Sequence, residues 1–129
     1  MADVNRGNRP ISPHLTIYRR ELNMVMSIGH RIAGVAVGGA AVLVVWWFLA
    51  AAGDPDTFAF VDGLLTSWIG GLVLLAALAA LWYHFFSGIR HLVWDAGVGF
   101  ELDTAHKAGI GVLVAAAVMT VITWIAAYF

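Results

Sequence analysis

The sequence predicts an all-α membrane protein with three transmembrane helices, and two observations support this fold class. Of the 129 residues, 61% are hydrophobic and only 12% are charged, a composition that lies outside the range of ordinary soluble domains. Three segments, 32–53, 64–83 and 108–129, contain no Asp, Glu, Lys or Arg. Each is close to the roughly 20 residues that a helix needs to cross a bilayer. Three such spans leave almost nothing for a soluble domain.

The polar start of the chain predicts a short arm ahead of the membrane domain. Residues 1–24 are polar and contain Pro10 and Pro13, so we expect an irregular cytoplasmic arm over 1–24 and a three-helix transmembrane domain over 25–129. The three spans are predicted at approximately 25–53, 62–95 and 105–128.

The second span is the longest, and its ends have local signals. Asp62 could serve as its N-cap, while Gly97 and Gly99 would stop it after Asp95. A helix of this length would measure about 45 Å, so its last turns should emerge from the hydrocarbon.

Basic residues indicate how the chain is oriented. They are concentrated before the first span, whereas the link after it carries three aspartates and no Lys or Arg. By the positive-inside rule the N-terminus is cytoplasmic and the C-terminus periplasmic. A start without an Arg-rich and Ser-rich transit segment favours the bacterial cytoplasmic (inner) membrane over the mitochondrial inner membrane.

The absence of cysteine limits which redox centres this chain can hold. Without a thiolate it cannot ligate an iron–sulfur cluster of the all-cysteine type. Any such cluster would have to lie on another subunit.

The stretch HFFSGIRHLVWD, residues 84–95, places ionisable side chains at the end of the second span. His84 and His91 are two helical turns apart on nearly one face, about 10.5 Å along the axis, so they cannot both bind one iron. If a bis-histidine haem is present, one of them supplies a single axial ligand and the other ligand comes from elsewhere. Gly88, one turn after His84, leaves room for a porphyrin edge.

Further polar groups lie at the same depth. His91 and Asp95, at i and i+4, can form a charge-assisted pair near the interface. On the first span Ser27, His30 and Arg31 share one face. Ionisable groups inside a membrane are functional candidates by default.

Each of these residues also fits a simpler role that involves no cofactor. Arg31, Arg90 and Asp95 fit interfacial anchoring equally well. His84 could instead make a structural hydrogen bond to a neighbouring helix, and His14 and His106 are expected to be surface or packing residues. Residue chemistry alone therefore indicates a small three-helix membrane protein with a haem or proton-active site.

Three motifs, taken together, are more specific than any single residue. RPISPHLTIY (9–18), MSIGHRIAG (26–34) and HFFSGIRHLVWDAG (84–97) closely resemble the cytochrome b large membrane-anchor subunit of succinate dehydrogenase, respiratory complex II. The motifs occur in that family's order, and the resemblance covers essentially the whole chain.

The resemblance implies roles for particular residues. His84 would be an axial ligand of a b-type haem, with the second ligand supplied by the small anchor subunit. Ser27 and Arg31 would help bind ubiquinone, and His30, Arg31 and His91 would lie near the haem propionates. No complete active site is implied within this chain, and no residue is assigned a catalytic role.

The resemblance also implies partners. These are the flavoprotein subunit, the iron–sulfur subunit, the small membrane-anchor subunit and the lipid bilayer; a higher oligomer of the complex is compatible with them, and no nucleic acid is expected. Two alternatives remain: a haem-free structural anchor, and an unrelated small b-type cytochrome or haem-transfer protein. His84 with Gly88 beside it argues against the first, and the arm RPISPHLTIY argues against the second.

Overall fold

The computed structural model describes residues 20–128, which form four α-helices. Helices α1 (Leu22–Ala51), α3 (Trp68–Asp95) and α4 (Leu102–Tyr128) are long, and α2 (Pro55–Thr66) is short. The three long helices are each long and apolar enough to cross a membrane. The predicted all-α fold with three long apolar helices is therefore confirmed, and the short helix α2 was not predicted. Residues 1–19 of the predicted arm lie outside the described residues.

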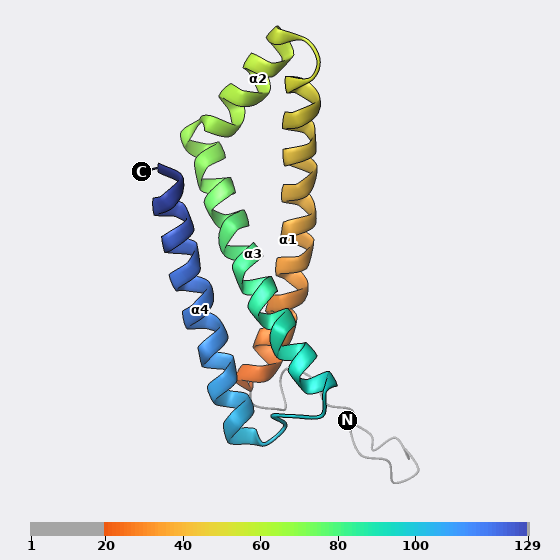
Figure 1. The fold of residues 1–129 in the computed structure, drawn as a ribbon, viewed down its shortest axis with the longest axis vertical. Coiled ribbons are helices and arrows are strands. Elements are labelled where there is room, and N and C mark those ends of the chain that lie inside the picture. The colour runs from red at the N-terminus through yellow and green to blue at the C-terminus, as the bar shows by residue number, and fades with distance from the viewer. Residues whose placement is uncertain (1–19, 129) are drawn as a thin grey trace, which may run out of the picture.

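Helix α3 lies at the centre of the arrangement. It packs against both α1 and α4, and Figure 1 shows α1 and α3 close together at one end and diverging toward α2. The end where they meet holds the start of α1, the end of α3 and the start of α4 (Figure 1). We call it the α3–α4 end.

The prediction of one helix over 62–95 was wrong about where that helix begins. The chain forms two helices here, and Asp62 lies within α2 instead of capping a helix. The N-cap of α2 is Asp54, whose carboxylate accepts a hydrogen bond from the backbone N–H of Thr57 at 3.0 Å. The Asp62 carboxylate accepts a hydrogen bond from Trp47 Nε1 at 3.0 Å, which ties α2 to the end of α1.

Ser67 and Gly70 cause the break between α2 and α3. Ser67 is extended, with φ −61° and ψ 161°, and its hydroxyl accepts from the backbone N–H of Gly70 at 3.1 Å. A Cβ at Gly70 would lie 2.3 Å from the carbonyl oxygen of Leu65, so the turn admits only glycine there. A serine cap inside an apolar segment therefore ends one helix and begins the next.

Glycines end α3, as predicted. The helix stops at Asp95, and Gly97 and Gly99 have positive φ values of 80° and 83°, a backbone conformation that side-chain-bearing residues rarely adopt. Trp94 Nε1 donates to the carbonyl of Gly99 at 3.1 Å, which closes the connection back onto the helix.

Little of the apolar surface is covered by the chain itself. Large hydrophobic side chains are exposed along all three long helices, as expected where lipid or other protein subunits surround a helix bundle. Within residues 20–128 the buried apolar side chains are mostly small: Met26, Ala33, Ala50, Val61, Ala105, Val112 and Ala116. The helices thus approach closely through small residues.

Candidate functional site

Three histidines from two helices lie together near the α3–α4 end. The ring of His30 on α1 stacks on His84 of α3, with centroids 4.1 Å apart and planes inclined by 22°. The same ring lies 5.0 Å from that of His91. The sequence placed these histidines on facing polar surfaces at one depth, and the structure brings all three into one half-buried cluster.

The hydrogen bond of His84 determines which of its nitrogens is free. His84 Nδ1 lies 3.1 Å from the backbone carbonyl oxygen of His30. Because a carbonyl can only accept, Nδ1 carries the proton, and Nε2 of the neutral ring keeps its lone pair. The structural hydrogen bond weighed as an alternative role for His84 is therefore present. It is also the bond that typically fixes the tautomer of a metal-ligating histidine.

Glycines make room around the His84 ring on two sides. A Cβ at Gly34 of α1 would lie 2.9 Å from His84 Cε1, so Gly34 allows the ring to approach α1. A Cβ at Gly88 would meet nothing within 4 Å, which leaves open space one turn beyond His84.

These observations test whether a haem fits the residues present. A suitable axial ligand needs an unprotonated nitrogen and an unobstructed approach, and His84 Nε2 and the space at Gly88 meet these needs. His30 Nε2 is buried and has no hydrogen-bond partner among residues 20–128, which is costly unless another group supplies one. The residues fit a cofactor that brings acceptors to the cluster.

Ser27 and Arg31 lie beside this cluster on α1. Ser27 is half-buried and Arg31 is exposed, and neither forms a hydrogen bond or ion pair with another residue of 20–128. Tyr83 holds this part of α1 in place, because its hydroxyl donates to the carbonyl of Met26 at 2.9 Å. Its ring packs on Gly29, where a Cβ would lie 2.9 Å from Tyr83 Oη.

Arg90 has a role that sequence reasoning missed. The side chain is only 7% exposed, and its Nη2 donates to Asn23 Oδ1 of α1 at 2.5 Å and to the carbonyl of Ala105 on α4 at 3.0 Å. The guanidinium carbon lies 3.9 Å from the centroid of the Trp94 ring. Arg90 thus links all three long helices, which excludes simple interfacial anchoring.

The predicted pairing of His91 with Asp95 does not form. Asp95 is exposed. The ring of His91 instead packs edge-on against the ring of Trp94, with the two ring centroids 5.4 Å apart. Within the described part of the chain the one ion pair is that of Lys107 with Asp103. Water solvates the Asp95 carboxylate at the end of a helix, so an ion pair there would gain little.

Two further histidines, His14 and His106, lie outside this cluster in the sequence. His106 is exposed on α4, as expected for a surface residue, and His14 lies outside the described residues.

Gly34 provides a test of how tightly His84 is held. Gly34→Ala should push the His84 ring from its position, because overpacking of this kind costs about 1 to 3 kcal/mol. For a haem held at His84, we expect less of it in the purified protein, or a shifted absorption maximum. Gly38→Ala is the matched control, since a Cβ at Gly38 meets nothing within 4 Å. Equal effects of the two substitutions would contradict a specific role for Gly34.

Arg90 provides a test of the three-helix link. Arg90→Ala removes the hydrogen bonds to Asn23 and to the Ala105 carbonyl, and losing a hydrogen bond to a charged group costs about 1.5 to 3 kcal/mol. We expect a lower temperature of thermal unfolding for the purified protein. Lys107→Ala, which removes an exposed cation at the same end, should change it little; an equally small change for both would refute the link.

These features define a class of protein: a small membrane subunit of three apolar helices, with a histidine cluster suited to a haem at one end. The family model described as "Succinate dehydrogenase/Fumarate reductase transmembrane subunit" matches residues 5–123. The chain belongs to this family, and the resemblance inferred from the three motifs is confirmed.

Individual relatives are similar in sequence to this chain over most of their length. The succinate dehydrogenase cytochrome b556 subunit of Paracoccus denitrificans is 46% identical over 125 residues, which cover 97% of this chain and 96% of that protein. The protein of the same name from Rickettsia bellii is 34% identical over 119 residues, covering 92% and 93% of the two chains. The mitochondrial succinate dehydrogenase cytochrome b560 subunit of Mus musculus is 36% identical over 115 residues, covering 85% and 66%.

Proposed function

We propose that the chain binds a b-type haem together with the small anchor subunit and helps form the ubiquinone-reduction site of succinate dehydrogenase. The observation that carries the proposal is the state of His84. Its Nδ1 proton is donated to the His30 carbonyl at 3.1 Å, which leaves Nε2 as an available axial ligand. The cytochrome names of the relatives support the same cofactor.

The remaining residues of the cluster would hold the periphery of the haem. The propionates are anionic and favour N–H donors. They would be faced by His91, Arg31 and His30, whose buried Nε2 has no partner in the part of the chain that the structure describes. When bound, haem b provides a one-electron redox centre. His84 would supply one ligand to the iron, and the 84–91 spacing allows no second ligand from this helix face. The family resemblance implies that the second ligand would come from the small anchor subunit.

Ser27 and Arg31 would serve the quinone. Arg31 would donate to a quinone carbonyl and stabilise negative charge as it develops there, and Ser27 would donate a second hydrogen bond. Their separation by four residues puts both side chains on one face of α1. The hydroxyl of Tyr83 donates a hydrogen bond to the Met26 carbonyl, and this bond would fix the position of that face of α1 relative to His84.

The charges of the chain and its family suggest how it would lie in the membrane and where its partner subunits would dock. Arg6, Arg9, Arg19 and Arg20 precede α1, so the α3–α4 end would face the cytoplasm and the C-terminus the periplasm of a bacterial inner membrane. The flavoprotein and iron–sulfur subunits would dock at that end, and the small anchor would pack beside α1 and α3. Electrons from succinate would reach quinone on the cytoplasmic side.

A reduced-minus-oxidised spectrum of the purified complex, with its subunit count, tests the proposal. We expect a low-spin b-type haem in a complex of four different subunits. A four-subunit complex without haem would establish the structural-anchor alternative, and haem in a preparation that lacks the flavoprotein and iron–sulfur subunits would favour the independent cytochrome.

A further inference from the structure

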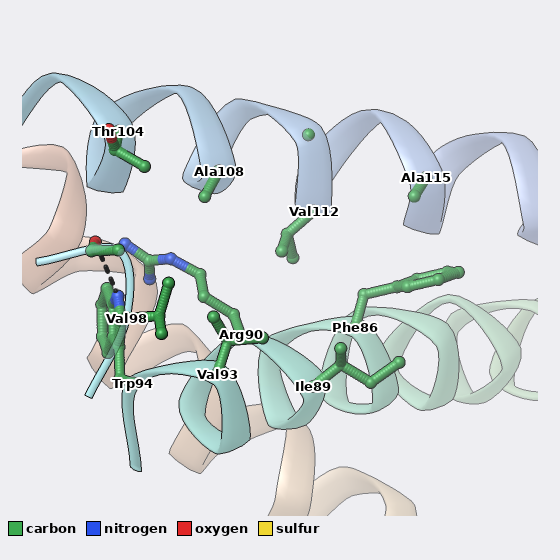
Figure 2. A pocket seen from close by; sticks show the side chains of 12 residues that line it. Phe86, Ile89, Arg90, Val93, Trp94, Val98, Thr104, Ala108, Val112 and Ala115 are labelled. Atoms are coloured by element: carbon green, nitrogen blue, oxygen red, sulfur yellow. Dashed lines mark hydrogen bonds between the residues drawn. The ribbon is translucent and has the colours of Figure 1, made fainter. Parts of the chain in front are cut away.

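The buried side chain of Arg90 reaches the first turn of α1. Figure 2 shows Arg90 extending from α3 toward the start of α4, with its guanidinium beside the Trp94 ring. From this position Nη2 donates a hydrogen bond to Asn23 Oδ1 at 2.5 Å. Asn23 is the second residue of α1 and is half-buried. A hydrogen bond from a charged donor, which is stronger than one between neutral groups, therefore holds the start of α1 against α3.

The first turn of α1 depends on such contacts with other helices. Among the described residues, the N-cap residue Glu21 makes no side-chain hydrogen bond that caps the helix, so no local cap fixes this turn. On the side of α4, a Cβ at Gly109 would lie 2.8 Å from Met26 Sδ and 3.8 Å from Asn23 Oδ1. The Asn23 amide thus lies between α3 and α4, and its bond to α3 fixes the direction in which this turn faces.

The same face of α1 carries the two residues proposed to bind quinone. Ser27 follows Asn23 by four residues, and Arg31 follows Ser27 by four. Side chains at i and i+4 lie on one face of a helix, one turn apart. A rotation of the first turn would therefore move Ser27. The short serine side chain cannot compensate for such a movement, whereas the long side chain of Arg31 can.

We propose that Asn23 and Arg90 are a positioning pair, which holds the Ser27 hydroxyl where it donates to a quinone carbonyl. Neither member of the pair would touch the quinone. This role rests on the proposed function, in which Ser27 and Arg31 bind quinone. It adds that the affinity for quinone depends on a buried hydrogen bond between α1 and α3.

The test compares two substitutions of similar size at Asn23 in the purified complex. Asn23→Leu removes the acceptor, whereas Asn23→Asp keeps an acceptor oxygen for the guanidinium of Arg90. We expect Asn23→Leu to raise the KM for ubiquinone by about 3- to 10-fold, the worth of one hydrogen bond. The kcat should stay within about twofold, because loss of uniform binding raises KM alone. Asn23→Asp should keep the KM near that of the unmodified complex.

Thr123→Val is the matched control. Thr123 Oγ1 accepts a hydrogen bond from Trp82 Nε1 at 3.0 Å, and this part-buried bond joins α3 to α4 without involving α1. The substitution removes an acceptor with little change of shape, as Asn23→Leu does. It should leave the KM for ubiquinone unchanged, whatever its effect on thermal stability.

Three outcomes would overturn the positioning role. These are an unchanged KM in Asn23→Leu, an equal rise of KM in Asn23→Leu and Asn23→Asp, and an equal rise in Thr123→Val. If Asn23→Leu fails to assemble, Asn23→Ala replaces it with the same expectation, because the smaller side chain leaves space for water beside the guanidinium.

Arg31→Leu, measured in parallel, separates this role from the proposed function. If Arg31→Leu loses quinone activity while Asn23→Leu keeps the normal KM, the quinone site stands and the positioning pair is refuted. If neither substitution affects quinone reduction, the proposed quinone site itself is refuted.

Discussion

Replacement of His84 by leucine should abolish haem binding in the assembled complex. Loss of partners that only orient a ligand typically costs 10- to 100-fold in affinity, so removal of the ligand itself should lower haem affinity by at least about 100-fold. The measurement is the low-spin haem absorbance per complex, normalised to the protein content of the preparation. Succinate oxidation by an artificial dye should continue, because our proposal gives no residue of this chain a part in it.

His91 is the matched control for His84. It lies on the same face of α3, is also half-buried, and contacts the same His30 ring, but our proposal gives it no bond to iron. His91→Leu should therefore keep the low-spin spectrum, with a shifted midpoint potential from the change near the propionates. A low-spin spectrum that survives in His84→Leu and disappears in His91→Leu would reverse the assignment.

The position of this cluster could largely be predicted from the sequence. The seven-residue spacing of His84 and His91 is a property of any α-helix, and His30 lies on a second amphipathic segment at the same depth. The contact of His30 with both rings was not predictable, since it depends on how α1 crosses α3. The His84 ring approaches α1 at Gly34, where a Cβ would lie 2.9 Å from His84 Cε1.

Errors in the predicted fold came from using charge-free segments to define helices. Segment 64–83 has no charged residue, but Ser67 interrupts it, because a hydroxyl that caps the next helix changes hydropathy very little. The residue type of Asp62 favours a helix N-cap. In the structure its carboxylate instead accepts a hydrogen bond from Trp47 on another helix. Such a partner depends on tertiary structure.

Arg90 was misinterpreted for a related reason. One of its two acceptors is the backbone carbonyl of Ala105, and no sequence pattern marks which backbone carbonyl a side chain of another helix will reach. Asn23, the other acceptor, is a polar residue near the start of a span, and this position was a usable signal. Cations near helix ends usually reach water, and that general expectation failed for a side chain enclosed by three helices.

Replacement of Arg31 by leucine should separate the two activities of the complex. Arg31 is exposed beside the histidine cluster, where its guanidinium could stabilise charge that develops on a quinone oxygen. Removing one such donor typically costs 10²- to 10³-fold in rate, so succinate–quinone activity should fall by about 100-fold. Succinate oxidation by an artificial dye should stay nearly intact.

Two further variants make the Arg31 result specific. Arg31→Lys should recover only part of the quinone activity, because an ammonium keeps the charge but lacks the planar donor fork. Lys107→Leu, which removes an exposed cation from the same end of the bundle, should leave both activities unchanged. An equal loss of quinone and dye activity in Arg31→Leu would indicate a defect in assembly and would argue against a quinone site at Ser27 and Arg31.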